Sequence, residues 1–476
     1  MKRPKGKGSV YERGTPAFDA KVLATSFNKR DPGQRPKLLI EANDIMDVIN
    51  AVKRAQRENL KISIVSGGHS WSQNHLREGC LLLSMARFNS INVDAERRRA
   101  IVGPGCWGID LDRALKKHDL FFPVAHVPDV CMGGFLLQGG FGWGSTFLGN
   151  ACESVIGIDV VLADGSLIHA SEEENPDLFW SARGSGPGFF GIVVRYHLKV
   201  HPRPKFQGMQ LQVFKMKHME EIYAWADRIG ADVPSSVEFQ FVMTPKAMGI
   251  FSPGIEVFAP VLTNSYKEAR EAVSFITKGP LRKKASFTPP LIPVSTAHMG
   301  IVANITHFPA TAKWCTDNMW SNAPVEDLMP GLKRIAETMP PAPSHSLWLN
   351  WPSRAGKRPD MALNLDARRY IAVYGEWFDS ADDAKYANWA TERMSELAHL
   401  SVGVQLADEN LGRRPARFTT DNNMARLDKA RAKYDPNGLF NSWAGRFTPS
   451  TKYSPKAADS KNKKNHQGVE HVFTTN

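Results

Sequence analysis

Apolar residues recur with two different periods in the first part of the chain. Over 45–60 they return every three to four residues, which predicts an amphipathic helix, and over 61–65 they alternate, which predicts a strand. The strand stops at 66–70, a loop whose two adjacent glycines permit backbone conformations that a Cβ would obstruct. Two more short strands are expected at 80–84 and 100–102. Helices and strands therefore mix here, as in an α/β domain.

The pattern then changes to glycine-rich loops that separate apolar strands. Six glycines occupy the twelve positions 133–144, too many for a helix interior, where each costs ~1 kcal/mol relative to alanine. So much glycine usually lets the backbone approach another group closely. Strands are expected at 155–163 and 192–200. Pro202 and Pro204 then interrupt the chain, and we expect a domain boundary near residue 205.

From about 206 to 400 the period-two alternation dominates, and helical stretches such as 267–277 and 381–397 interrupt it. This combination predicts a mostly antiparallel sheet with helices on one face. A helix is then expected over 422–433, and the polar tract 451–476 has the composition of a disordered tail. The clearest strand segments of the middle region are 210–214, 237–243, 255–261, 347–351 and 370–377.

The composition is that of an ordinary globular protein, with 42% hydrophobic and 23% charged residues. No apolar stretch reaches the ~18–20 residues of a membrane span, and the basic segment 1–8 leads into polar sequence rather than a hydrophobic signal region. The five cysteines are an odd number without a C-x-x-C pair, which fits neither a disulfide framework nor a zinc site. We therefore expect a cytoplasmic protein with no metal and no membrane partner.

The net charge of +12, from 60 Lys and Arg against 48 Asp and Glu, raises the question of nucleic-acid binding. Much of the excess lies at the two ends, in 1–8 and 452–464. Basic ends of this kind are more often solvated tails than binding surfaces. Nucleic acid is therefore not an expected partner, and salt-sensitive retention on DNA that persists without the tails would contradict this.

One glycine motif can be excluded as a nicotinamide site. Residues 186–191 match G-x-G-x-x-G, but that fingerprint requires a strand before the glycines and a helix after them. Here the predicted order is reversed, with a short helix over 175–183 before the glycines and the strand 192–200 after them. Glycine loops on an α/β domain can still hold phosphates through backbone N–H groups.

Several separate motifs, taken in order, resemble one flavoprotein family. The loop 66–70 and the glycine-rich run are followed by further short motifs, and the closing turn lies near the end of the chain. Their order and spacing resemble FAD-linked oxidases of the vanillyl-alcohol-oxidase or PCMH-type flavin fold, within the berberine-bridge-enzyme-like group. The segments that carry the resemblance are 66–70, 128–144, 160–165, 175–180, 182–184, 191–193 and 434–437.

The resemblance implies an α+β fold with an interrupted flavin domain. The resemblance is clear over residues of about 20–205 and 405–445, and it extends only in outline to the residues between them. The implied arrangement is an FAD-binding α/β domain over 1–205, an inserted antiparallel-sheet substrate domain over 206–404, and a C-terminal segment, 405–450, that returns to the flavin domain. The tail 451–476 lies outside both.

For His69 the resemblance implies a covalent bond to the 8α-methyl of FAD, because a neutral imidazole is nucleophilic and Gly67 and Gly68 let the backbone approach the flavin. Many relatives have a second link from a cysteine at the position of Val127, so a single link is expected here. Cys131 is interpreted as a small buried residue. The residues expected at the FAD are Ser66, Gly67, Gly68, His69, Ser70, Val127, Pro128, Val130, Gly133, Gly134, Gly139, Gly140, Gly142, Gly191, Ile192, Val193 and Asn441.

The expected reaction is hydride transfer to FAD from a CH–OH or CH–NH carbon of a sugar, an alcohol, or an alkaloid or phenol. The Tyr-x-Asn of some relatives is absent, since Val402 and Val404 stand there. Polar residues that share one face of a predicted strand are other candidates for the general base. The alternative function is a flavin-binding protein without turnover. The candidate bases, in order, are Tyr374, Tyr370, Glu376 and Glu238.

The electron acceptor is the least determined part of this prediction. In relatives, the residue three positions after the second-link cysteine gates the access of oxygen to the flavin. Here that residue is Val130, whose small aliphatic side chain resembles the form that admits oxygen, so an oxidase is expected. The alternative is a dehydrogenase with another acceptor.

Overall fold

The computed structural model describes residues 9–249, 252–352 and 358–447. The expected tail 451–476 and the basic segment 1–8 lie outside these residues. The first sheet has the order β1-β2-β4-β3, in which β2, β4 and β3 run parallel and β1 antiparallel. Asp44 caps α2 by accepting a hydrogen bond from the Asp47 amide at 2.9 Å. These elements are β1 (Ser9–Glu12), α1 (Pro16–Ala24), β2 (Leu38–Glu41), α2 (Ile45–Arg57), β3 (Ile62–Val65) and β4 (Leu81–Ser84).

A second sheet is wholly antiparallel, in the order β5-β6-β10-β8-β9. One of its faces contributes Ile158 and Val160 to the core that this part of the molecule shares with the first sheet. Its strands are β5 (Ile91–Asp94), β6 (Arg99–Val102), β8 (Val155–Val161), β9 (Leu167–Ala170) and β10 (Ile192–Lys199). Helices α3 (Gly108–Lys116), α4 (Met132–Leu137), α5 (Ser145–Leu148) and α6 (Pro176–Ala182) accompany it, with a small ladder of β7 (Leu120–Phe121) and β11 (His201–Pro202).

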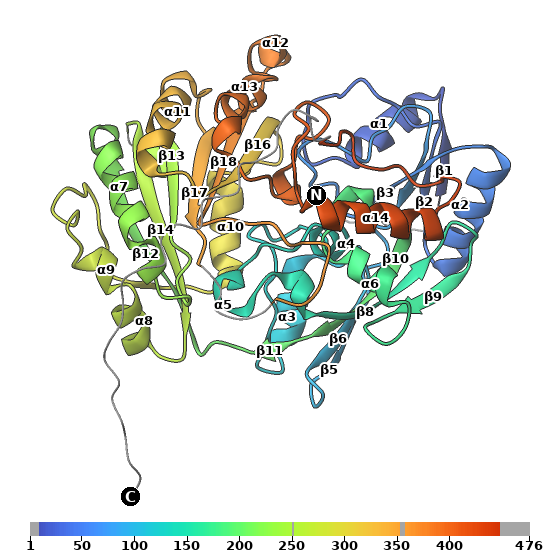
Figure 1. Ribbon diagram of the computed structural model, residues 1–476, viewed down its shortest axis with the longest axis horizontal. Coiled ribbons are helices and arrows are strands. Elements are labelled where there is room, and N and C mark those ends of the chain that lie inside the picture. Colours follow the sequence, from blue (N-terminus) through green and yellow to red (C-terminus); the bar gives the residue numbers. More distant parts are fainter. Residues whose placement is uncertain (1–8, 250–251, 353–357, 448–476) are drawn as a thin grey trace, which may run out of the picture. The chain divides into compact units, whose positions relative to one another are not determined.

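The third sheet has seven strands in the order β15-β12-β14-β13-β17-β18-β16. Helices cover one of its faces (Figure 1), where strand residues such as Phe241 and Val257 share a core with α7, α8, α9, α11 and α13. This confirms the expected antiparallel sheet with helices on one side. The strands are β12 (Phe206–Lys215), β13 (Gln240–Thr244), β14 (Gly254–Thr263), β15 (Ile292–Pro293), β16 (Lys313–Ser321), β17 (His345–Asn350) and β18 (Arg369–Trp377). The helices are α7 (Met219–Ile229), α8 (Tyr266–Ala272), α9 (Ser274–Thr277), α10 (Thr296–Thr306), α11 (Val325–Thr338), α12 (Asp383–Tyr386) and α13 (Trp389–Glu396).

Strand β16 was not among the strands expected from the sequence, because its centre is polar. Asp317 and Asn318 are fully buried there, which alternation of apolar residues cannot predict. Asp317 accepts a hydrogen bond from Nε of Arg414 at 2.8 Å, and Asn318 donates to the backbone carbonyl of Gln405 at 3.0 Å. These partners come from a segment almost a hundred residues later, so only the tertiary structure makes the burial possible.

The segment around Phe440 returns to the first sheet. Phe440 forms a parallel bridge with Ile62, and the Ile62 amide donates to the carbonyl of Leu439 at 2.8 Å. Helix α14 (Asp421–Tyr434) precedes this bridge, and Tyr434 donates to Asp177 at the start of α6 at 2.5 Å. The domain boundaries near 205 and 404 stay a prediction.

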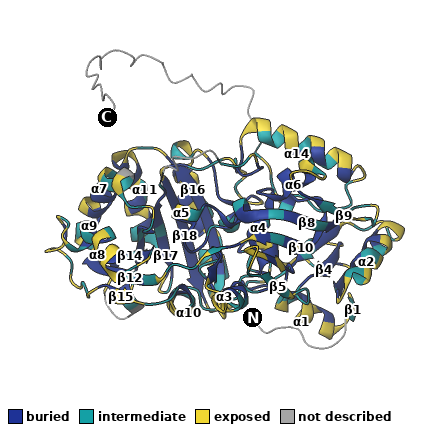
Figure 2. Ribbon diagram, turned by 90° about the horizontal axis from the view of Figure 1, so that it is seen from below, coloured by how far each residue is buried: buried dark blue, intermediate teal, exposed yellow. Residues whose placement is uncertain are grey.

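Figure 2 shows buried residues along both large antiparallel sheets, with exposed residues mainly on the surrounding helices. In the described residues, no helix is long and apolar enough to span a membrane.

We expect Gly188→Ala to destabilise the protein, because the packing of the returning segment leaves no room for a methyl group. A Cβ at Gly188 would lie 2.1 Å from Cε2 of Trp443, whose indole N–H donates to the carbonyl of Ser185 at 2.8 Å. Overpacking of this kind costs about 1–3 kcal/mol in free energy of unfolding. Denaturant unfolding measures the change, and an unaltered free energy of unfolding would contradict the close packing of Trp443 on Gly188.

Candidate active site

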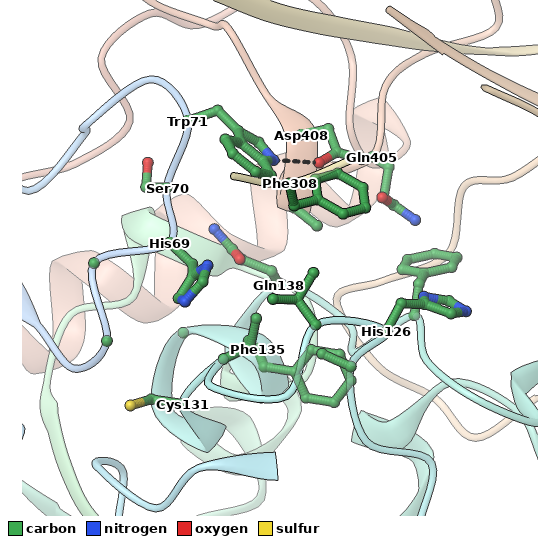
Figure 3. Close-up of a pocket in the computed structure, with 18 of the residues that line it drawn as sticks. His69, Ser70, Trp71, His126, Cys131, Phe135, Gln138, Phe308, Gln405 and Asp408 are labelled. Carbon is green, nitrogen blue, oxygen red and sulfur yellow. Dashed lines mark hydrogen bonds between the residues drawn. The ribbon is translucent and has the colours of Figure 1, made fainter. Parts of the chain in front are cut away.

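A cavity of about 570 Å³ lies where the glycine-rich loops face the third sheet. One wall comes from the loop after β3 and from α4, and the opposite wall from α10 and from the face of the third sheet that points away from the core shared with α7, α8, α9, α11 and α13. Figure 3 shows His69 and Gln138 from the first wall and Asp408 beyond them across the same space. The returning segment supplies Asn441 and Ser442 at one end.

Most of the residues expected at the FAD line this cavity. Among the described residues, five expected ones are not part of the lining: Pro128, Gly139, Gly140, Gly142 and Ile192. They lie beside lining residues in the same loops or strand, and the Gly142 amide donates to Ser145 at 2.9 Å. The expected residues that line the cavity are Ser66, Gly67, Gly68, His69, Ser70, Val127, Val130, Gly133, Gly134, Gly191, Val193 and Asn441.

Glycines bring the two loops of the first wall into direct contact. A Cβ at Gly67 would lie 2.8 Å from the Cys131 sulfur, and one at Gly133 would lie 2.3 Å from the Ser66 hydroxyl oxygen. Gly68 has φ +70°, a conformation that favours glycine. Cys131 is buried and lines the cavity beside this contact. The loop that carries His69 is therefore held against the start of α4.

His69 is oriented from two sides. Its Nε2 lies 3.0 Å from Oδ1 of Asp129, and both side chains are mostly buried. The imidazole also stacks on Phe27, with ring centroids 4.4 Å apart and an interplanar angle of 24°. Burial opposes ionisation of Asp129, but hydrogen bonding to His69 helps to hold the pKa of that carboxyl below its ordinary value.

On the opposite wall, Asp408 accepts three hydrogen bonds from side chains. Oδ1 accepts from the Trp71 indole at 2.7 Å, and Oδ2 accepts from the Tyr374 hydroxyl at 2.9 Å and from the Tyr370 hydroxyl. All four side chains line the cavity. Burial raises the pKa of Asp408, although the three hydrogen bonds oppose that shift. Burial, together with the charge of Asp408, raises the pKa of both tyrosines well above 10.

Sequence reasoning selected the two tyrosines but missed Asp408. The only signal was an acidic pair, Asp408 and Glu409, in the segment where the Tyr-x-Asn of relatives is absent. Asp408 lies in a short 3₁₀ helix, Leu406–Asp408, 34 residues beyond Tyr374 in sequence. No spacing rule connects such a pair, because the chain folds back between them.

The two glutamates predicted as bases lie outside the lining, within the described residues. Glu238 accepts hydrogen bonds from the Gly144 amide at 2.6 Å and from Gln240 at 3.1 Å, and its Oε2 lies 2.9 Å from Nε2 of His126, which does line the cavity. Glu376 is 1% exposed, and its Oε1 lies 3.2 Å from Nδ1 of His345. Burial raises the pKa of Glu376 well above its ordinary value.

Comparison with known proteins identifies the class of this fold. A family model described as an FAD binding domain matches residues 36–171. The FAD-linked oxidoreductase nodO of Hypoxylon pulicicidum is 28% identical over 415 residues, which are 86% of this chain and 91% of that protein. The structure of 6-hydroxy-D-nicotine oxidase from Arthrobacter nicotinovorans has a TM-score of 0.80 at 21% identity and covers 92% of this chain and 97% of its own. BBE-like 1 of Physcomitrella patens has a TM-score of 0.80 at 17% identity, with 91% and 96% covered.

The fold is thus that of an FAD-binding flavoprotein. The chain is an FAD-dependent oxidoreductase with the vanillyl-alcohol-oxidase or PCMH-type, berberine-bridge-enzyme-like fold. The resemblance stated from the sequence motifs and the expected enzyme class are confirmed. The residues present also fit FAD, because Gly67, Gly68, Gly133 and Gly134 line the cavity without side chains, and a Cβ at Gly134 would meet no atom within 4 Å.

Proposed function

We propose that the protein is an oxidase that removes a hydride from a CH–OH or CH–NH carbon of a bulky, largely apolar small molecule and passes the electrons to oxygen. The observation that carries the proposal is the position of Asp408, Tyr370 and Tyr374 on the cavity wall opposite the flavin loops. A substrate between the two walls has a hydride acceptor on one side and proton acceptors on the other. When bound, FAD supplies the two-electron acceptor.

The loop residues hold and orient the cofactor. Ser66 to Ser70, Val130, Gly133, Gly134 and Asn441 form the flavin side of the cavity in this proposal, with His69 as the single covalent attachment. A carboxylate oxygen near Nε2 favours the tautomer that carries its proton there. Nδ1 then holds the free lone pair and is the nucleophilic atom.

The proton of the substrate O–H or N–H is taken by the Tyr–Asp cluster. A tyrosine with a raised pKa remains neutral and accepts a proton only if it releases its own, and both hydroxyls already donate to Oδ2 of Asp408. Asp408 is therefore the base, and Tyr374 or Tyr370 relays the proton to it. Such assistance contributes about 10²–10⁴-fold to the rate.

The substrate side of the cavity is largely apolar. Leu211, Val242, Phe258, Leu347 and Leu349 of the sheet, together with Met299 and Val302 of α10, line it. His345 is one of the polar residues of this side: burial lowers its pKa well below 6.5, and its Nδ1 lies 3.1 Å from the Pro343 carbonyl, which leaves Nε2 as an acceptor. A ring-containing substrate with an N–H or O–H group fits this wall. The relative in Arthrobacter nicotinovorans, a 6-hydroxy-D-nicotine oxidase, supports a substrate of this kind.

Anaerobic mixing with a panel of aromatic amines, alkaloids, phenols, alcohols and sugars tests the proposal. We expect bleaching of the flavin absorbance by apolar ring-containing alcohols or amines, and little reduction by free sugars. A chain that binds FAD but is reduced by no member of the panel would be the flavin-binding protein without turnover. Reduction by sugars alone would contradict the apolar substrate class.

We expect Val130→Leu to slow reoxidation of the reduced flavin by oxygen several-fold while leaving reduction by substrate nearly unchanged. Val130 lines the cavity and is only partly buried, so one added methylene narrows the space beside the flavin loops. The measurement reduces the flavin without air, admits oxygen, and follows absorbance and peroxide. Slow reoxidation in the unmodified protein that Val130→Leu does not change would favour a dehydrogenase with another acceptor.

A further inference from the structure

Three ionisable side chains converge on the second sheet, away from the cavity. Asp159 on β8 is paired directly with His169 on β9 and with Arg195 on β10, and His197 is paired with Gly157 two residues from Asp159. Because side chains alternate along a strand, Asp159 points to the face opposite Ile158 and Val160, which lie in the core. In Figure 1 the three strands lie side by side.

The three potential ligand atoms are already close together. Oδ1 of Asp159 lies 2.8 Å from Nδ1 of His169 and 3.1 Å from Nε2 of His197, and all three atoms lie within 4.8 Å of one another. The two imidazole rings are nearly perpendicular, at 87°, with centroids 5.1 Å apart. Zinc bound at ~2.0–2.2 Å in tetrahedral geometry places neighbouring ligand atoms roughly 3.4 Å apart. Small side-chain rotations are enough to reach that arrangement.

Two neighbours shape this cluster. The absence of a side chain at Gly157 makes room for the His169 ring, since a Cβ there would lie 2.9 Å from Cε1 and 3.1 Å from Nε2 of His169. Arg195 donates to Oδ2 of Asp159 at 3.1 Å, which orients the carboxylate so that Oδ1 faces the imidazoles. The guanidinium charge also opposes a bound cation, so removal of this charge should strengthen metal binding.

We propose that Asp159, His169 and His197 form a binding site for one divalent metal ion of the zinc class, with water as the fourth ligand. Two imidazoles and a carboxylate are ligands of the type that zinc takes in proteins. None of the three residues is among those described as lining the cavity, so the role is to cross-link β8, β9 and β10 rather than to take part in oxidation. The cysteine pattern could not indicate this site, because its ligands are a carboxylate and two imidazoles from three different strands.

Calorimetric titration of the chelator-treated full-length flavoprotein with Zn²⁺ tests the site. We expect one equivalent to bind and the thermal unfolding midpoint to rise with zinc, because a ligand that binds only the folded state stabilises it. His169→Ala and His197→Ala each weaken zinc binding at least tenfold, and the double variant no longer binds one equivalent of zinc. His399→Ala, a change at an exposed histidine outside the cluster, leaves it unchanged.

Two further variants keep all three ligands and guard against misfolding as an explanation. Gly157→Ala displaces the His169 ring and weakens zinc binding, whereas Arg195→Gln removes the opposing charge and strengthens it several-fold. If the three side chains formed only a structural network of hydrogen bonds, neither variant would change zinc binding. The proposal is overturned if the unmodified protein does not bind zinc. It is also overturned if the His169→Ala/His197→Ala protein still binds one equivalent of zinc.

Discussion

Replacing Asp408 by asparagine is expected to lower the rate of flavin reduction by substrate by about 10²–10⁴-fold, the usual contribution of a general base. Asparagine has nearly the same shape but cannot take a proton from Tyr374 or Tyr370, whose hydroxyls donate to Oδ2. Asp408 is not among the residues expected at the FAD, so we expect the variant to keep its cofactor. Anaerobic stopped-flow absorbance measures the rate, and thermal unfolding confirms that the variant is folded.

The pH profile separates a base from a structural residue. Burial raises the pKa of Asp408 above 3.8, so the carboxylate becomes protonated, and the reduction rate falls, at a higher pH than for an exposed aspartate. This acidic limb should disappear in Asp408→Asn. Tyr374→Phe and Tyr370→Phe should lose less activity individually, because the other hydroxyl can still relay the proton.

Matched carboxylate variants identify the base. Asp232→Asn, at an exposed position, should leave the rate unchanged. Glu376→Gln and Glu238→Gln should have smaller effects than Asp408→Asn, because within the described chain neither side chain lines the cavity. A loss confined to Glu376→Gln or Glu238→Gln, with Asp408→Asn fully active, would show that the base was assigned to the wrong residue.

His69→Ala is expected to abolish the covalent attachment of FAD. The unmodified protein should keep its flavin after acid precipitation, and the variant should release all of it into the supernatant. In such a bond His69 would supply Nδ1 as the nucleophile and give up the proton on Nε2, while FAD would supply the 8α-methyl carbon, lose one proton from it, and take up two electrons that oxygen can remove. The Asp129 carboxylate, 3.0 Å from Nε2, is placed to take the second proton.

Asp129→Asn tests that role without removing the nucleophile. An amide cannot take the Nε2 proton, so the covalently bound fraction should form more slowly and reach a lower level at a fixed time, while total FAD binding stays near that of the unmodified protein. Mass spectrometry of the intact chain gives the fraction directly. Complete release of FAD from the unmodified protein by acid would contradict a covalent bond at His69, although the same loops could still hold the cofactor non-covalently.

Local patterns in the sequence predicted the glycine loops on one side of the cavity, and the family resemblance supplied the residues expected at the FAD. The glycines of 66–70 and 133–144 mark loops that pack closely, and twelve of the seventeen residues expected at the FAD line the cavity. The antiparallel sheet of the middle region followed from period-two alternation, because one of its faces packs on apolar helices and the other lines an apolar cavity. These features depend on neighbours in sequence or on one buried face, which is the information that a local pattern carries.

The cluster around Asp408 depended on the tertiary structure instead. Asp408 reaches Tyr374 and Trp71 across 34 and 337 positions of sequence, and strand β16 buries Asp317 only because Arg414 comes back to pair with it. The same holds for Asp159, His169 and His197, which belong to three strands. The sequence by itself determined which residues could form loops, strands and a flavin site. Only the fold decided which buried polar groups found partners, because burial of a charge is tolerated only where distant segments supply its hydrogen bonds.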